Sequence, residues 1–469
     1  MNYMKKLNIL IAGFMMLGLS SCSDSFFDLK PNDQVTRDQI YKTENDFKLA
    51  VNACYSKLQT QMDFYIEMCE FRSDELTLDA PTAGTQDRYD IDQFKEVASN
   101  GILDNLWANF NNGVYRCNLV LASIDNATFD ETKKAQYKAE AMFIRSLTYF
   151  NMYRSWGCVP ITYKPVTVEE SLTIGRATEQ QMYDMIVGQL EEIVNNNMLP
   201  KKYTGDDIGR ATLGAAKALL GKAYLTFGKP EMAAKVLKSL IEDNSHSLLP
   251  NIADVFDVNN KWNKEILFAI RYNKTVEGEG HGAWYSLSNL SDNNYRTETL
   301  NKLYTVDDKR AEMLDYVKVP GVNVYLIKKF YDERDATNRT YGSENILLRY
   351  SDVLLMYAEA LNEVSFSNSQ TSEQAKALNK VHERAGLTPI DVTKAADKDA
   401  FRKLIEVERQ KEFAYEGQRW FDSVRLGGAK KAALNEGHEI QDYQMVYPIP
   451  SSELERINNT DLLWQNAGY

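Results

Sequence analysis

Three glutamates towards the C-terminal end of the chain have a spacing that acid–base chemistry could use. Glu408, Glu412 and Glu416 lie four residues apart, so on a helix their carboxyl groups would share one face. Inverting glycosidases need two carboxyl groups roughly 6.5–9.5 Å apart, and adjacent helical turns come close to that range. The segment also carries three arginines that would surround these acids: Arg409, Arg419 and Arg425. Such a mixture favours a structural ion network, and we expect no catalytic residues here.

A second group of residues has the chemistry of sugar recognition. A sugar ring offers an apolar C–H face and a rim of hydroxyls, so it is bound by an aromatic plane and hydrogen-bonding side chains. Residues 281–296 provide both in a polar loop, and of the six tryptophans only Trp284 is expected in an open loop. The candidate ligand-binding residues there are His281, Trp284, Tyr285, Asn293, Tyr295 and Arg296. The alternative is that Trp284 packs on its own loop as a local core.

A second polar loop runs from Phe71 to Phe94, where Arg88 and Tyr89 are further candidates for ligand contact. The same loop holds three aspartates that could bind calcium: Asp87, Asp90 and Asp92. They lack the twelve-residue pattern of a calcium loop, so solvated charge is the plainer interpretation. The four histidines lie far apart in the sequence. We therefore expect no metal site and no cofactor.

The first twenty-two residues have the form of a lipoprotein export signal. Two lysines precede an apolar run from Ile9 to Leu19, which is too short to span a bilayer as a helix. Leu19-Ser20-Ser21-Cys22 follows and is typical of a bacterial lipobox. Because Ser23 rather than Asp follows the cysteine, the expected destination is the outer membrane. We expect a signal peptide at 1–21, lipidation at Cys22 and a lipidated tether at 22–36.

Helical patterns indicate the elements that would position these residues. Thr43 to Asp46 resembles a capping box, and the apolar residues that follow recur every three or four positions. The same spacing runs from Ala135 to Tyr153 and ends at Gly157 and Pro160. These patterns predict two long amphipathic helices.

Residues 215–242 carry the pattern of a tetratricopeptide helix pair. Small residues such as Gly221 and Ala233 would let two helices approach closely, with the turn between them at Gly228-Lys229-Pro230. One repeat cannot bury its faces alone, so partner helices are expected. The candidates are 130–156, 178–196, 347–364 and 371–385.

The composition of the 469 residues is that of an ordinary globular protein, with 44% hydrophobic and 26% charged residues. The net charge of −12 argues against a nucleic-acid partner, because phosphate contacts need a basic face. Four cysteines follow Cys22, and no two of them have C-x-x-C spacing: Cys54, Cys69, Cys117 and Cys158. Buried free thiols are favoured, although the sequence cannot choose among disulfide pairings.

Four segments follow the lipobox in a characteristic order: 139–160, 347–362, 408–425 and 447–469. The third reads Glu408-Arg409-x-x-Glu412-Phe413-x-x-Glu416-Gly417-x-Arg419-Trp420-Phe421-Asp422, and the fourth contains Tyr447-Pro448-Ile449-Pro450 and ends at Gly468-Tyr469. Together they resemble the SusD/RagB family of outer-membrane nutrient-binding lipoproteins over nearly the whole chain. Small departures are Cys158 and Ala467, where the family usually has Gly and Pro.

The resemblance implies a mainly α fold, with a tetratricopeptide-like helical scaffold and a loop-rich, irregular second half. The SusD-like domain would span 37–469, with helical repeats at about 40–244 and 347–425 and a loop-rich insertion at about 245–345. It also implies a lipid-anchored lid, facing the cell exterior, on a SusC-like TonB-dependent transporter. Such a lid captures an oligosaccharide for polysaccharide utilization and is not an enzyme.

Three other functions stay open. The first is the same lid architecture with peptide or glycopeptide cargo. The second is a surface glycosidase that uses the carboxylates at 408–416. The third is a pure tetratricopeptide scaffold for other proteins, which would have no use for the polar aromatic loop.

Overall fold

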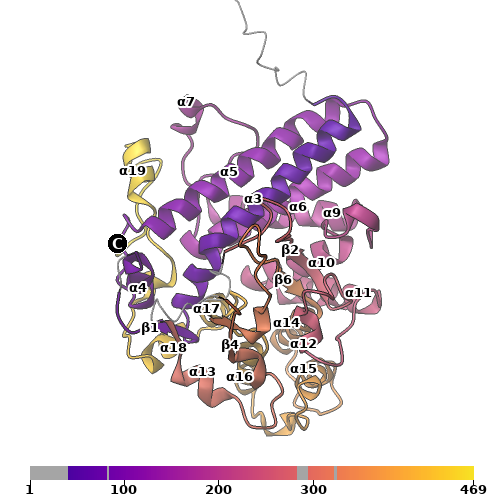
Figure 1. Cartoon of the computed structure of the whole chain (residues 1–469), viewed down its shortest axis with the longest axis vertical. Coiled ribbons are helices and arrows are strands. Elements are labelled where there is room, and N and C mark those ends of the chain that lie inside the picture. The colour runs from indigo at the N-terminus through magenta and orange to yellow at the C-terminus, as the bar shows by residue number, and fades with distance from the viewer. Residues whose placement is uncertain (1–40, 82–83, 283–293, 322–324) are drawn as a thin grey trace, which may run out of the picture.

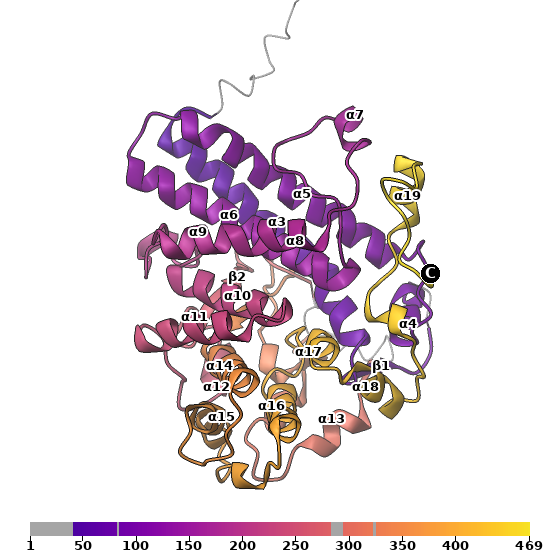
Figure 2. The same ribbon diagram turned by 180° about the vertical axis from the view of Figure 1, so that it is seen from behind.

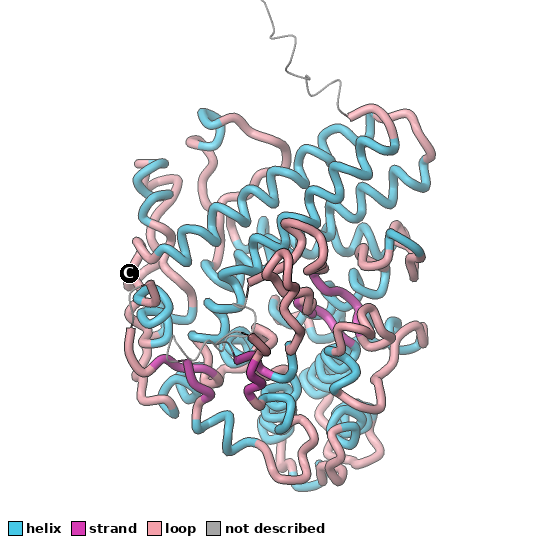
Figure 3. Tube along the Cα trace, viewed as in Figure 1, coloured by secondary structure: helices cyan, strands magenta, loops and turns pink. Residues whose placement is uncertain are grey.

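The computed structural model describes residues 41–81, 84–282, 294–321 and 325–469. In these ranges the chain is mainly helical, with three two-stranded antiparallel sheets (Figure 3). The predicted mainly α class is therefore confirmed. The signal peptide, Cys22 and the tether lie outside the described residues, as do Trp284, Tyr285 and Asn293.

Three long helices form one layer of the molecule: α3 (Glu44–Phe71), α5 (Gly101–Ser123) and α6 (Glu131–Trp156) (Figure 1). The predicted capping box starts α3, because the backbone N–H of Asp46 donates to Thr43 Oγ1 and that of Thr43 donates to Asp46 Oδ2. At its end α6 stops at Gly157, whose φ of 74° suits glycine. Both predicted long helices are confirmed.

The predicted tetratricopeptide pair is also confirmed as α10 (Leu213–Thr226) and α11 (Pro230–Glu242). A Cβ added at Gly221 would lie 2.6 Å from Leu237 Cδ2, so only glycine allows this approach of the two helices. Helix α11 packs on α14 (Tyr350–Val364), which in turn packs on α15 (Glu373–Arg384). Figure 2 shows α8 (Glu179–Tyr183) and α9 (Gln189–Asn195) between α6 and the α10–α11 pair.

The remaining helices are mostly short: α4 (Gln86–Asp92), α7 (Val168–Ser171), α12 (Ala253–Phe256), α13 (Glu298–Leu303), α16 (Lys398–Glu412), α17 (Arg419–Arg425), α18 (Ala429–Asn435) and α19 (Ser451–Ile457). Among the helices of the described ranges, none has both the length and the apolarity that crossing a bilayer requires. The four described cysteines are free thiols, buried at Cys54, Cys69 and Cys117 and half-buried at Cys158. This agrees with the interpretation favoured from the sequence.

Two of the three sheets in the described ranges connect segments that lie far apart in the sequence, and the third is formed by neighbouring segments. Strand β1 (Leu76–Leu78) pairs with β3 (Asn294–Arg296), β2 (Ile266–Ile270) pairs with β6 (Asn345–Arg349), and β4 (Tyr316–Lys318) pairs with β5 (Tyr325–Ile327). Because β6 runs directly into α14, the β2–β6 pair fastens the strand-containing segment to the helical scaffold.

Candidate functional site

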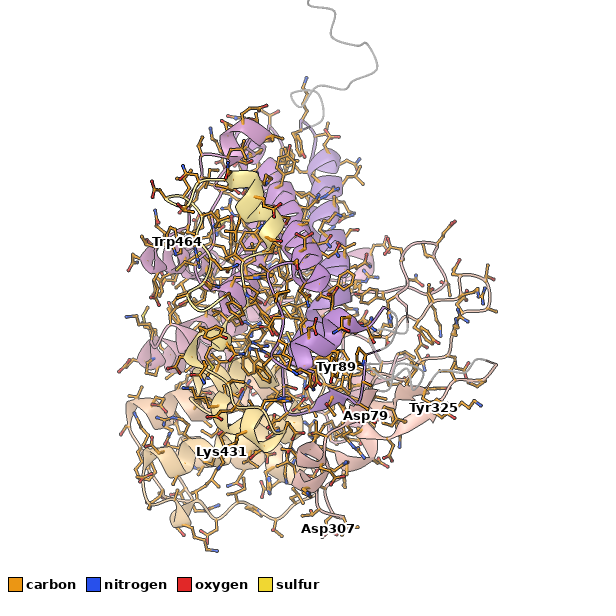
Figure 4. The ribbon with its side chains drawn as sticks, turned by 90° about the vertical axis from the view of Figure 1, so that its left-hand side faces the viewer. Asp79, Tyr89, Asp307, Tyr325, Lys431 and Trp464 are labelled. Atoms are coloured by element: carbon orange, nitrogen blue, oxygen red, sulfur yellow. The ribbon has the colours of Figure 1, made fainter. Side chains whose placement is uncertain are left out.

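The two candidate loops meet at one end of the β1–β3 ladder. Leu78, the last residue of β1, is paired with Asn294, the first residue of β3. The part of the 71–94 loop that follows β1 and the part of the 281–296 loop that precedes β3 are therefore attached at the same end of this ladder. Figure 4 shows Asp79, which directly follows β1, near Tyr89 and apart from Trp464. We give the name ladder face to the surface at the Leu78–Asn294 end of the β1–β3 ladder, together with Asp79 and Tyr89.

The base of the 71–94 loop is closed by a buried ion pair. Arg72 Nη1 lies 2.5 Å from Glu96 Oε2, and Arg72 Nη2 donates to the carbonyl of Gln444 at 2.9 Å. The hydroxyl of the last residue, Tyr469, donates to Glu96 Oε1 at 2.7 Å. The closing motif of the chain therefore holds together the two ends of a candidate binding loop.

Asp92, at the end of α4, fastens this helix to β1. Its Oδ2 accepts hydrogen bonds from Thr77 Oγ1 at 3.2 Å and from the backbone N–H of Leu78 at 3.4 Å. Burial raises the pKa of Asp92 to about 6. Solvated charge is therefore the wrong interpretation for Asp92, since a side chain buried under a loop cannot be recognised from sequence spacing. The described residues contain no cluster of His, Cys, Asp and Glu that could hold a metal ion.

Arg88 and Tyr89, the predicted contacts of the first loop, both lie on α4. Arg88 makes a two-point ion pair with Glu67 of α3, at 2.9 Å from Nε and 2.8 Å from Nη2, and its side chain is 24% exposed. Tyr89 is half-buried and packs against the main core. The ion pair holds the Arg88 guanidinium in one orientation while part of it stays open to solvent.

Arg296, the last residue of β3, lines a hollow of about 720 Å³ beside the ladder. Its Nη1 donates to the carbonyl of Leu314 at 3.3 Å. Other polar residues of the lining are Asn301, Tyr304, Thr305, Asp307, Lys309 and Glu312. None of them was a candidate from the sequence, where they belong to the polar part of the expected loop-rich insertion. Tyr295 belongs to β3 through its backbone, which pairs with Thr77.

His281 is 5% exposed and forms a bridge with Tyr341 through two backbone hydrogen bonds of 3.0 and 2.9 Å. Its Nε2 lies 3.1 Å from the hydroxyl of Ser343. Burial lowers the pKa of His281 to about 4, so the ring is neutral at physiological pH. This corrects the expectation from the sequence: His281 is one of the residues that hold the segment, because its ring is turned into the protein.

A second hollow, of about 590 Å³, lies between α3 and β2, near the start of the same segment. Its lining includes Asn52, Tyr55, Gln59, Arg210, Arg271 and Glu279. Gln59 Nε2 donates to the carbonyl of Arg271 at 2.8 Å, which joins α3 to the chain that leads into the candidate loop. The first hollow therefore includes Arg296 of the candidate loop, whereas the lining of the second reaches only to Glu279, two residues before that loop begins.

The three glutamates of the third motif are buried in an ion network, as the sequence predicted. Glu408 contacts Arg310 at 2.6 Å, and Glu416 contacts Arg349 at 2.7 Å and Lys329 at 2.6 Å. Between them, Glu412 contacts a set of three arginines: Arg310, Arg349 and Arg384. The network joins α16 to α15, to β6 and to the segment before β4.

The partners differ from those expected. Arg409, Arg419 and Arg425 do not surround the three glutamates; each pairs with acids on other elements, namely Asp352, Asp422, Asp74, Glu406 and Glu359. Burial alone would raise the pKa of Glu412, but Arg384, Arg349 and Arg310 outweigh it and hold that pKa well below its usual range. A carboxyl that stays ionised in this way is a poor proton donor.

Sequence comparison finds two family profiles that cover most of the chain. The profile described as "SusD family" matches residues 270–469, and that described as "Starch-binding associating with outer membrane" matches residues 25–225. Among similar proteins, SusD-like protein P25 of Formosa agariphila is 25% identical and covers 96% of this chain and 97% of its own length. SusD-like protein P2 of the same organism is 26% identical, over 97% and 98%.

Solved structures share the fold. A laminarin-binding SusD-like protein superposes with a TM-score of 0.77 at 24% identity, over 92% of this chain and 100% of that one. Surface glycan-binding protein A from Bacteroides thetaiotaomicron, in complex with laminarihexaose, gives a TM-score of 0.74 at 22% identity, over 90% and 99%.

Proposed function

Because the chain belongs to the SusD family, we propose that it is a cell-surface lipoprotein that captures an oligosaccharide and delivers it to a SusC-like TonB-dependent transporter. In this proposal Cys22 carries the lipid anchor in the outer membrane. The matching family description, starch binding in association with the outer membrane, supports that location. The domain limits expected from the sequence, 37–469 with an insertion at about 245–345, belong to the same proposal.

The observation that carries this proposal is the pairing of Leu78 with Asn294. It brings two loops that are rich in aromatic and hydrogen-bonding residues to one place on a rigid helical scaffold. Rigid elements that present polar, aromatic loops are the usual basis of a binding site. We therefore place the ligand at the ladder face.

In the proposed mechanism, capture is reversible and no covalent bond changes. Rings of Trp284, Tyr285, Tyr89 and Tyr295 would stack on the C–H faces of sugar units, and Arg88, Arg296 and Asn293 would bond to hydroxyls. Glu67 already orients Arg88, so binding would cost less side-chain entropy. Weak affinity suits transfer: a Kd of about 1 mM corresponds to only about −4.1 kcal/mol.

A laminarin-type β-glucan is the first ligand to test, because two similar structures are named for laminarin or laminarihexaose. The experiment is a glycan-array screen of the lipid-free mature chain, residues 23–469, which keeps every described residue. Binding to β-glucans without release of shorter sugars supports the proposal. Binding to no glycan by folded protein would favour peptide cargo, which uses backbone hydrogen bonds in an extended groove. Release of shorter sugars would favour a glycosidase.

Delivery needs its own test. We expect a SusC-like transporter to co-purify with the full lipoprotein from detergent-solubilised outer membranes. Absence of any TonB-dependent transporter from the purified complex would contradict this part of the proposal.

A further inference from the structure

Two buried carboxyl groups lie where α3 leads into β1, directly behind the ladder face. Glu70 belongs to the last turn of α3 and Glu75 immediately precedes β1, and both are 0% exposed. Glu70 Oε1 accepts the backbone N–H of Gly417 at 2.6 Å, and Glu75 Oε2 accepts that of Tyr415 at 3.0 Å. Both carboxyls therefore bind the backbone of the same turn, residues 413–417, which follows α16.

The other two oxygens of this pair, Glu70 Oε2 and Glu75 Oε1, accept no hydrogen bond from a donor in the described ranges. Because they accept N–H groups only two residues apart in one turn, the two carboxyls are close neighbours, and the charge of Glu70 contributes to the raised pKa of Glu75. Ionised carboxylates only accept hydrogen bonds, so a hydrogen bond between the two carboxyls would require a proton on one of them. Two buried carboxyls this close do not both ionise readily, as in paired catalytic aspartates.

The charges around the pair do not offset a second negative charge. Lys329, on the short 3-10 helix Lys328–Phe330, lies 2.6 Å from Glu416. Arg419 of α17 lies 2.6 Å from Asp74. Each nearby cation is therefore matched by a carboxylate of its own.

The other titratable groups that face the pair are neutral, because burial raises the pKa of each: Tyr304, Tyr415 and Cys69. Burial also raises the pKa of both carboxyls, that of Glu70 to about 7. One proton in the pair is consequently the stable state at neutral pH, with the pair titrating as a unit.

The 413–417 turn is strained, and it is joined to the β1–β3 ladder. Tyr415 is buried with a φ of 64°, a conformation that a bulky residue keeps only where its surroundings enforce it. On the other side, the carbonyl of Glu75 accepts the N–H of Thr297 at 3.1 Å, and Thr297 Oγ1 donates to the carbonyl of Asp74 at 2.7 Å. Thr297 directly follows β3.

We propose that Glu70 and Glu75 share one proton and together act as positioning residues for the ladder face. With the proton in place, the pair holds the 413–417 turn and the start of β1 in their observed arrangement. Loss of the proton at higher pH puts two buried negative charges side by side, which loosens the β1–β3 ladder and weakens ligand capture. Only the effect on capture rests on the proposed function.

The sign of the pH effect follows from linkage. An unfolded glutamate has a pKa of about 4.3, and the pair is raised above that value in the folded protein. Its stabilising contribution is therefore fully present below about pH 4.3 and is lost as the pH rises through the folded pKa. Each extra proton held by the folded state changes the folding equilibrium constant by about tenfold per pH unit in that window.

The test compares the lipid-free mature chain with Glu75→Gln. A glutamine keeps an acceptor for the Tyr415 N–H and offers an N–H to Glu70, so it mimics the protonated acid. Between about pH 5 and about pH 8, the folding equilibrium constant of the wild type should fall more steeply than that of Glu75→Gln, by about a factor of ten per pH unit. Urea unfolding at each pH measures both constants. The infrared difference spectrum of the wild type minus Glu75→Gln at neutral pH should contain a carboxylic acid band, because Glu344 contributes equally to both proteins.

Glu70→Gln is the second variant, and it serves if Glu75→Gln does not fold. The matched control is Glu344→Gln, because burial raises the pKa of Glu344 to about 7 but this residue bonds to Trp262, away from the pair. Equal pH slopes of stability in the wild type and the pair variants would overturn the proposal. So would wild-type-minus-variant infrared difference spectra that contain no carboxylic acid band for either pair variant.

The effect on capture is tested by measuring the Kd for laminarihexaose as a function of pH. One pH unit above the pKa of the pair, about one-tenth of the molecules keep the proton, so the apparent Kd of the wild type and of Glu344→Gln should rise about tenfold. Glu75→Gln should not show this rise. A flat profile in the wild type would overturn the positioning role. If no glycan binds at all, the proposed function fails, while the stability and infrared measurements still decide whether the proton is shared.

Discussion

At the residue scale, the glutamates of α16 differ from catalytic carboxyls in what they touch. Glu412 is buried among three guanidinium groups, and Arg310 is shared between Glu408 and Glu412. Buried charges are costly unless they are paired, so removing one member leaves its partners uncompensated. The same surroundings keep Glu412 ionised, which suits a structural anion better than a general acid.

We therefore expect Glu412→Gln to destabilise the fold by about 3–5 kcal/mol, the usual cost of breaking a buried ion pair. Urea unfolding of the mature chain measures this loss. The control is Glu363→Gln: Glu363 pairs with Lys398 and Arg402 but is 21% exposed. Its loss should cost about 1 kcal/mol or less. A Glu412→Gln variant of unchanged stability that abolished a glycan-cleaving activity would contradict the structural role.

At the element scale, a three-residue ladder joins the two candidate loops, and α4 supports it through one side chain. Thr77 and Leu78 of β1 both donate a hydrogen bond to the same carboxylate oxygen, Asp92 Oδ2. So short a pair of strands has little stability of its own. Its order depends on Asp92 on one side and on Thr297 and Glu75 on the other.

Asp92→Ala should therefore raise the rate of amide hydrogen exchange in residues 76–78. The loss of three hydrogen bonds to a buried carboxyl, from Thr77, Leu78 and Gln93, should also cost about 1–3 kcal/mol in stability. Asp90→Ala is the matched control on the same helix, because Asp90 bonds only to Gln86 among described side chains. Equal exchange rates in the two variants would show that α4 does not hold the ladder.

The α10–α11 pair offers a second prediction at this scale. Gly221→Ala would place a Cβ 2.6 Å from Leu237 and force the two helices apart, so we expect a loss of about 1–3 kcal/mol. At Gly188 an added Cβ meets nothing within 4 Å, and Gly188→Ala should be neutral or slightly stabilising. Thermal unfolding of both variants measures the difference. A harmless Gly221→Ala would mean that close helix approach is not required.

At the scale of the whole molecule, the helical scaffold was predictable because its signals are local. The Thr43–Asp46 capping box, the end of α6 at Gly157 and the small-residue pattern around Gly221 each depend on neighbouring residues in the chain. The ion network on α16 was predictable in kind but not in its partners. Arg310, Arg349 and Arg384 come from distant segments, and no local pattern links them to Glu412.

The candidate site was predictable only as two separate loops. Their meeting depends on the pairing of β1 with β3, and three-residue strands leave no periodic signal in the sequence. The burial of individual side chains could not be predicted from the sequence either. His281 and Asp92 have the residue types of a ligand-binding loop, yet the structure turns both inwards. Residue type indicates the chemistry of a loop, whereas side-chain direction is decided by contacts from elsewhere in the chain.

In the proposed mechanism the ligand binds at the ladder face. Calorimetric titration of laminarihexaose into the mature chain, Trp284→Ala and Trp464→Ala tests it most directly. Trp464 is the matched control, because it is 49% exposed, lies over Arg176 and is well separated from Tyr89 and Asp79 in Figure 4. We predict about tenfold weaker binding for Trp284→Ala, as expected for the loss of an aromatic stacking contact, and unchanged binding for Trp464→Ala. Wild-type affinity in Trp284→Ala together with lost affinity in Trp464→Ala would contradict the claim and move the site away from the ladder.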